Sequence, residues 1–259
     1  MSILDEFSGM KARGEKIAVL TCYDASFANL MESAGVNALL VGDSLGMVLR
    51  GAKDTLGVTM ADMIYHTRCV AAGAQATAII TDLPYSSDTS PGIALDNASR
   101  LMQAGAHMVK LEGGKPQIVR GLKQSGIPVC GHLGFTPQSV HQLGGYKVQG
   151  RDEAGARKIL EDALALQEAG IDLLVLEMVP ASLACQITAR LAIPTIGIGA
   201  GTGCDGQVLV LHDMLGIYPG KTPKFARNFL QGTGGVQDAL VRYVRAVKDG
   251  SFPAAEHCF

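Results

Sequence analysis

Short apolar runs alternate along the chain with longer segments in which apolar residues recur at helical spacing. Eight such runs can be counted, at residues 17–24, 38–43, 76–84, 107–113, 128–134, 172–179, 194–200 and 207–213. Most are continuously apolar, which is typical of strands that crossover helices bury on both faces. The pattern therefore predicts a parallel α/β fold, and the eight runs fit the eight strands of a (β/α)8 barrel.

Amphipathic segments between these runs predict helices. They cover residues 26–35, 60–73, 94–105, 153–170 and 181–191, and residues 234–250 predict a closing helix. Three of these segments end at Gly35, Gly105 and Gly170, where glycine can adopt the left-handed conformation of a helix C-terminus. Between the seventh and eighth runs there is room for only a short turn or helix, so the barrel is expected to be irregular there.

Length and composition favour one domain over residues 1–259. The chain is 47% hydrophobic, and a (β/α)8 barrel typically takes about 250 residues. Lys and Arg number 22 against 24 Asp and Glu, and no basic run is present, which argues against a nucleic-acid partner and favours a small ligand.

The six cysteines are scattered without a CxxC pair, which indicates reduced core thiols in a cytoplasmic protein. Residues 1–16 carry charges where a signal peptide needs an apolar segment, and no apolar run reaches the ~18 residues of a membrane helix. We therefore expect a cytoplasmic location and no contact with a membrane.

Ionisable and hydroxyl side chains gather at the carboxyl ends of the apolar runs. They are Asp24, Asp43 with Ser44, Asp82, Lys110 with Glu112, His132, Glu177, and His212 with Asp213. In a (β/α)8 barrel these ends converge on one face, where such enzymes place their active sites. The segment 39–51, LLVGDSLGMVLRG, thus presents Asp43 and Ser44 to a site.

Carboxylates without a Cys/His cluster favour a hard cation, Mg²⁺ before zinc. Asp43 and Asp82 are the expected direct ligands, and Glu112 binds either directly or through water. Magnesium takes few protein carboxylates and completes its octahedron with waters and substrate oxygens. The alternative for any one Asp is that it caps the following helix.

Other strand-end residues also have structural alternatives. Lys110 and Glu112 project to the same face of a strand and could form an ion pair in the barrel mouth. His132 could be an ordinary core histidine. Glu177 follows four apolar residues, and a buried Glu needs a partner or a shifted pKa. We assign His212 and Asp213 to structural roles.

The segment GTGCDG, residues 201–206, matches a nucleotide-binding GxGxxG pattern formally. An apolar strand follows it, whereas a dinucleotide fold requires a helix there. It therefore predicts a glycine-rich turn.

Two longer connections, 44–59 and 135–151, follow strand ends, and the second suits a mobile lid or an oligomer contact.

In eight blocks the chain closely resembles the ketopantoate hydroxymethyltransferase family. The blocks are TCYDASFA, LLVGDSLGMVLRG, DLPYSS, AGAHMVKLEGG, PVCGHLGFTPQSVHQLGGYKVQGR, LLVLEMVP, IPTIGIGAGTGCDGQVLVLHD and PKFARNF. The resemblance implies a (β/α)8 barrel of the phosphoenolpyruvate/pyruvate superfamily. It also implies transfer of a hydroxymethyl unit from 5,10-methylenetetrahydrofolate to 3-methyl-2-oxobutanoate through a magnesium-chelated enolate, giving 2-dehydropantoate for pantothenate and coenzyme A synthesis.

The resemblance also implies roles for individual residues. Metal ligands fall on Asp43 and Asp82, with Glu112 as a further acidic member, and the 2-oxoacid contacts fall on Asp43, Ser44, Asp82 and Lys110. His132 stands at the position of a site histidine, and Glu177 at that of the proton acceptor. A homo-oligomer, a decamer of two stacked pentamers, is implied as well. Cys22, Gly203 and Cys204 depart from the family pattern without touching this chemistry.

Two other functions fit the carboxylate set. One is a different Mg²⁺-dependent carbon-carbon lyase or mutase of the same superfamily. The other is a catalytically silent barrel that binds a 2-oxoacid as an oligomeric scaffold.

Overall fold

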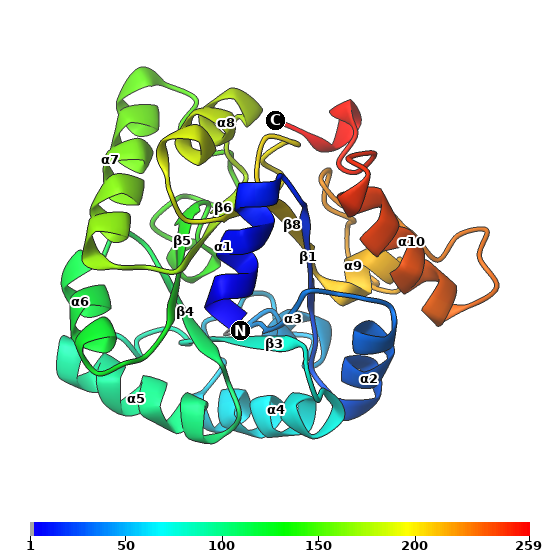
Figure 1. Cartoon of the computed structure of the whole chain (residues 1–259), viewed down its shortest axis with the longest axis horizontal. Helices are drawn as coiled ribbons and strands as arrows, with labels where there is room; N and C mark the ends of the chain where they lie inside the picture. The colour runs from blue at the N-terminus through cyan, green and yellow to red at the C-terminus, as the bar shows by residue number, and fades with distance from the viewer. Residues whose placement is uncertain (1–2) are drawn as a thin grey trace.

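A computed structural model describes residues 3–259 and contains a closed barrel of eight parallel strands in sequential order (Figure 1). The strands are β1 Ile17–Thr21, β2 Ala38–Val41, β3 Ala78–Asp82, β4 Met108–Glu112, β5 Val129–Gly134, β6 Leu173–Glu177, β7 Thr195–Ile198 and β8 Gly206–Leu209. Strand β1 pairs with both β2 and β8, which closes the barrel. The prediction of eight parallel strands is confirmed, although most are shorter than the apolar runs.

Helices surround the barrel. The α-helices are α1 Ile3–Arg13, α2 Ala25–Ser33, α3 Leu45–Val48, α4 Met60–Gly73, α5 Pro91–Gln103, α6 Pro116–Gln124, α7 Glu153–Ala169, α8 Ala181–Arg190, α9 Leu211–Leu215 and α10 Val236–Lys248, and short 3-10 turns lie at Pro137–Ser139 and Ala255–His257. The six predicted helices are present as α2, α4, α5, α7, α8 and α10. The sequence reasoning missed α1, α3, α6 and α9.

The last predicted strand was drawn too long. Strand β8 ends at Leu209, and α9 begins at Leu211, whose backbone N–H donates to Thr21 Oγ1 at 2.9 Å. His212 and Asp213 therefore lie on a short helix rather than at the end of a strand. This change of direction turns residues of α9 toward the barrel mouth.

Glycines end three of the predicted helices in the left-handed conformation. Gly35, Gly105 and Gly170 have φ values of 82°, 111° and 101°, so the left-handed conformation expected at these helix ends is confirmed. Of the short turn or helix expected between β7 and β8, the structure has turns. At the start of β8 a Cβ on Gly206 would collide with the carbonyl oxygen of Ile17, so the close backbone approach requires a glycine.

Helix α10 packs against the junction between β1 and β8. The buried Tyr243 hydroxyl of α10 donates to the carbonyl oxygens of Val19 at 2.9 Å and Gln207 at 3.1 Å. Tyr243 also packs edge-on against Phe229 and Phe252. These contacts fix the end of the chain beside β1 and β8.

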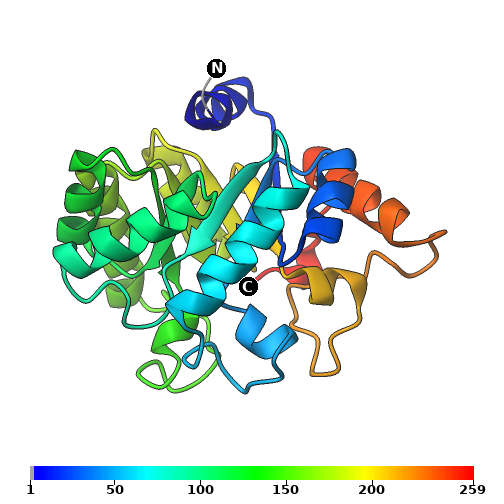
Figure 2. The ribbon, with the colours of Figure 1, turned by 90° about the horizontal axis from the view of Figure 1, so that it is seen from below.

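The two ends of the barrel differ. Helix α1 lies at one end, while α3, the 135–151 connection and the segment after β8 extend from the other (Figure 2).

None of the helices within residues 3–259 is long and apolar enough to cross a membrane. All six cysteines are free, but Cys185 is exposed, so the expectation of core thiols is wrong at that position.

Candidate active site

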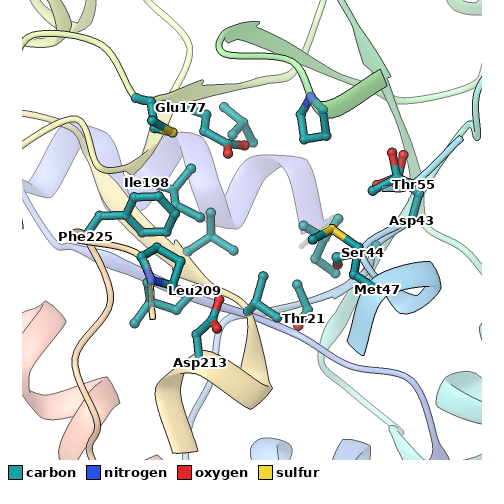
Figure 3. A pocket seen from close by; sticks show the side chains of 18 of the residues that line it. Thr21, Asp43, Ser44, Met47, Thr55, Glu177, Ile198, Leu209, Asp213 and Phe225 are labelled. Carbon is teal, nitrogen blue, oxygen red and sulfur yellow. The ribbon is translucent and has the colours of Figure 1, made fainter. Parts of the chain in front are cut away.

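A cavity of about 600 Å³ opens where the carboxyl ends of the strands meet (Figure 3). Every predicted site residue lines it: Asp43, Ser44, Asp82, Lys110, Glu112, His132 and Glu177. They come from the ends of β2 to β6, so the barrel brings together residues that are up to 134 positions apart in the sequence. The convergence expected from the strand-end pattern is thus observed.

Asp43 and Asp82 are buried beside each other. The backbone N–H of Asp43 donates to Asp82 Oδ2 at 3.0 Å, and the two residues are 4% and 3% exposed. Burial raises the pKa of Asp43 to about 8, and the neighbouring carboxylates of Asp82 and Glu112 add to the rise. Capping does not explain either carboxylate, whereas Asp24 does cap α2 by accepting from Phe27 N at 2.9 Å.

Lys110 supplies the positive charge of the cluster. Its Nζ lies 2.8 Å from Asp82 Oδ1, and its side chain is 5% exposed. Burial acts to lower the pKa of Lys110, but the carboxylates of Asp82 and Glu112 outweigh it and hold the pKa above its ordinary value. The ion pair considered as an alternative therefore exists, but its partner is Asp82 rather than Glu112.

His132 lies between two carboxylates. Its Nδ1 is 3.5 Å from Glu112 Oε1, and its Nε2 is 3.2 Å from Glu177 Oε2. Burial and the Lys110 charge act to lower the pKa of His132, but the carboxylates of Glu112 and Glu177 outweigh them and raise it to about 9. An ordinary core histidine has no such pair of partners, so His132 belongs to the polar cluster.

Ser44 is held by a residue that the sequence reasoning did not select. Tyr23 OH and Ser44 Oγ lie 2.9 Å apart. Burial raises the pKa of Tyr23, so its hydroxyl stays protonated and can donate or accept this hydrogen bond. Tyr23 follows β1 directly, and its place at a strand end was the available signal.

Gln138 is a second omission, and it ties a loop to the acidic cluster. Its Nε2 donates to Asp43 Oδ2 and to the carbonyl oxygen of Leu83, both at 2.9 Å. Its backbone N–H donates to Glu112 Oε2 at 3.0 Å. One residue of the 135–151 connection thus orients two of the carboxylates predicted to serve a metal.

The structural roles expected for His212 and Asp213 have different outcomes. His212 packs against Tyr23 with ring centroids 5.7 Å apart, in line with a structural role. Asp213 is 8% exposed and lines the cavity. We assigned it a structural role from the sequence, whereas α9 places it at the cavity wall.

Comparison with known proteins decides the family. The family model described as ketopantoate hydroxymethyltransferase matches residues 2–255. The chain belongs to the ketopantoate hydroxymethyltransferase family. A relative from Aromatoleum aromaticum named 3-methyl-2-oxobutanoate hydroxymethyltransferase is 60% identical over 99% of this chain and 96% of its own. Another of that name from Methylobacillus flagellatus is 61% identical over 96% and 97%.

Solved structures with little sequence identity share the fold of this family member. A phosphonopyruvate hydrolase in complex with oxalate and Mg²⁺ matches with a TM-score of 0.63 at 10% identity, over 81% of each chain. A 2,3-dimethylmalate lyase described as a PEP mutase/isocitrate lyase superfamily member matches with a TM-score of 0.56 at 19% identity, over 76% of this chain and 72% of the other. These likenesses show that the chain shares the barrel fold of those proteins.

The carboxylates of this transferase do not by themselves surround a metal ion. In the described part, residues 3–259, no three His, Cys, Asp or Glu side chains are grouped to hold one. Asp82 Oδ1 is buried and faces Lys110 Nζ at 2.8 Å, while both oxygens of Glu112 face protein donors, at Gln138 N and near His132. Asp43 and Asp82 are thus the two adjacent carboxylates available to a hard cation, and substrate oxygens and water would complete its coordination.

Proposed function

We propose that this chain transfers a hydroxymethyl unit from 5,10-methylenetetrahydrofolate to 3-methyl-2-oxobutanoate, giving 2-dehydropantoate and tetrahydrofolate. The observation that carries the proposal is the buried cluster in which Asp43, Asp82 and Lys110 adjoin the His132–Glu177 pair in one cavity. Family membership and the names of relatives about 60% identical support the reaction.

The residues present fit a magnesium ion. Asp43 and Asp82 are adjacent oxygen donors, and Asp82 Oδ1 has an unused lone pair beside the cavity. In this proposal they hold the ion directly, and Glu112 contributes through water because its own oxygens already face Gln138 and His132. When bound, Mg²⁺ supplies a Lewis acid for the oxygens of the 2-oxoacid.

Lys110 and Ser44 bind and orient the ketoacid. The Lys110 ammonium offers a positive charge to the substrate carboxylate, and Asp82 holds it at 2.8 Å. Ser44 Oγ, positioned by Tyr23, offers a further hydrogen bond. Because Lys110 is almost fully buried, its electrostatic interactions are stronger than in water.

Glu177 takes the proton from C3 of the bound ketoacid. Its carboxylate lines the cavity, and its contact with His132 Nε2 at 3.2 Å fixes its position. The C3 carbon then bonds to the one-carbon unit of the folate, water supplies the hydroxyl oxygen, and tetrahydrofolate leaves. General base catalysis of this kind typically contributes ~10²- to 10⁴-fold.

The two long connections form a cover for the cavity in this proposal. Tyr146 packs on Phe135 with ring centroids 4.9 Å apart, and its hydroxyl donates to Met47 Sδ at 3.5 Å. This contact joins the 135–151 connection to α3. A cover of this kind excludes bulk water during transfer.

We also propose that residues 1–259 form one domain and that copies assemble into a homo-oligomer, a decamer. The family resemblance supports the assembly, and the six free cysteines support a cytoplasmic location. Light scattering is expected to give a mass well above the 27.1 kDa of one chain. A mass of one chain at micromolar concentration would contradict the assembly.

The reaction is tested by incubating the protein with 3-methyl-2-oxobutanoate, 5,10-methylenetetrahydrofolate and Mg²⁺. We expect 2-dehydropantoate and tetrahydrofolate in equal amounts by liquid chromatography, and none after removal of divalent ions with EDTA. A folded protein that consumes neither substrate contradicts the proposal. Binding of the ketoacid without turnover would favour the scaffold alternative.

A further inference from the structure

The cavity has two ends of different character. The polar end holds Asp43 and Ser44, whereas Ile198, Leu209 and Phe225 wall the other end, and Glu177 lies beside Ile198 (Figure 3). A cavity of about 600 Å³ exceeds what a five-carbon ketoacid fills, since pockets of ~300–1,000 Å³ hold drug-sized ligands. The apolar end is therefore free for a larger, flat partner.

Asp213 lies at this apolar end. Its carboxylate rises from α9 into the cavity between Leu209 and Thr21 (Figure 3). Although the residue is 8% exposed, no hydrogen bond or ion pair joins that carboxylate to another group within residues 3–259. A buried carboxylate without a partner destabilises the folded protein, which is typical of a group kept for a ligand.

Burial determines the pKa of Asp213, and the Asp213 charge in turn raises the pKa of Tyr23. Burial raises the pKa of Asp213 to about 6, and no contribution from the other cavity carboxylates accompanies it. The raised pKa lies above the ordinary value of 3.8 but below 7. The carboxylate is therefore ionised at pH 7 and above. It offers two acceptor oxygens at a point away from the ketoacid's binding groups.

The folate donor of the proposed reaction presents a matching edge. Its pterin ring carries the 2-amino group and N3–H side by side, and this pair of parallel N–H donors suits one carboxylate in a bidentate arrangement. The ring faces need apolar walls, and the glutamate tail carries negative charge. Lys221 and Lys224 lie on the exposed rim of the same cavity end.

We propose that Asp213 is the pterin-recognition residue of the donor site, accepting hydrogen bonds from the 2-amino group and N3–H of 5,10-methylenetetrahydrofolate. The inference rests on the proposed function. The ring then lies between Leu209 and Phe225, with the glutamate tail directed to Lys221 at the rim. In this arrangement the one-carbon unit faces the polar end of the cavity, where C3 of the ketoacid is activated.

The first test compares Asp213→Asn with the wild-type protein and with Asp96→Asn, a control on the exposed face of α5. Since a hydrogen bond to a charged group outweighs one to a neutral group, the KM for 5,10-methylenetetrahydrofolate is expected to rise about 10- to 100-fold in Asp213→Asn. The KM for 3-methyl-2-oxobutanoate is expected to stay within about twofold. An unchanged folate KM, or a fall in kcat alone, overturns the inference.

A second test does not depend on how well the variant folds. Calorimetry measures the binding of tetrahydrofolate and of its 2-desamino-2-methyl analogue, which lacks the amino donor. The wild-type protein is expected to prefer tetrahydrofolate about 10- to 100-fold, and Asp213→Asn to lose most of that preference. A wild-type protein that binds both alike overturns the inference. If the wild-type protein forms no 2-dehydropantoate at all, the proposed function fails instead.

Discussion

Replacing Glu177 with Gln isolates the proton transfer that the site is proposed to perform. Gln keeps the size and one acceptor oxygen for His132 Nε2, now 3.2 Å from Glu177 Oε2, but it cannot accept a proton at neutral pH. We therefore expect Glu177→Gln to fold, to bind Mg²⁺ and to bind the ketoacid. The chemical step that needs a base is expected to fail.

The size of the effect follows from the role. Loss of a positioned general base costs ~10²- to 10⁴-fold in rate, equivalent to about 3 to 5 kcal/mol of transition-state stabilisation. The loss in folding stability is smaller, because one charge-assisted contact in a partly buried position, with the Glu177 side chain 13% exposed, is worth about 1 to 2 kcal/mol. That is a minor part of the ~5–15 kcal/mol typical of a folded domain.

The assay is exchange of the C3 hydrogen of 3-methyl-2-oxobutanoate in D₂O with Mg²⁺ and without folate. Proton NMR follows the loss of the methine signal and the collapse of the methyl doublet. Glu161→Gln, on the exposed face of α7, is the matched control and is expected to exchange like the wild-type protein. Exchange by Glu177→Gln at the wild-type rate would refute its role as the base.

Three further changes test other parts of the site. Asp82→Asn removes a carboxylate charge from the proposed metal site, so calorimetry is expected to show the same ketoacid affinity with and without Mg²⁺; a Mg²⁺-linked gain like that of the wild-type protein contradicts the ligand assignment. Gln138→Ala removes the 2.9 Å bond to Asp43 and is expected to raise the ketoacid KM about tenfold, while Gln124→Ala on the surface of α6 leaves it unchanged; equal KM values would make Gln138 irrelevant to the site. Asp213→Asn is expected to raise stability at pH 8, because burial raises the folded pKa from 3.8 to about 6 and ionisation then costs the folded state about 3 kcal/mol. That gain is expected to fall to about 0.5 kcal/mol near pH ~4, where the folded carboxyl is protonated and the unfolded one is partly protonated, and denaturant titrations at the two pH values check it.

Much of the barrel could be predicted because burial leaves a simple pattern. Strands covered on both faces are mostly apolar, and the carboxylates that end β3, β4 and β6 mark the catalytic face, as at Asp82 and Glu177. Helix α6 was missed although it is strongly amphipathic, with a buried face of Ile118, Val119 and Leu122.

The missed site residues depend on contacts that no local pattern encodes. Gln138 lies in a loop, and its amide reaches Asp43, 95 positions away, and Leu83, 55 positions away. Asp213 follows an apolar run, but the strand stops at Leu209 and one helical turn decides where its carboxylate lies. Which carboxylate pairs with Lys110 was also undecidable from spacing, since Glu112 is nearer in sequence and Asp82 is nearer in space.

The measurement that tests the central claim most directly is transfer of a labelled carbon. The protein is mixed with Mg²⁺, 3-methyl-2-oxobutanoate and 5,10-methylenetetrahydrofolate prepared from ¹³C-formaldehyde, and ¹³C NMR follows the label. We predict that the label appears in a hydroxymethyl group bonded to C3 of the ketoacid, and that neither Asp82→Asn nor Glu177→Gln forms this product at a comparable rate. Label that stays on the folate with the wild-type protein, or equal transfer by both variants, would contradict the account.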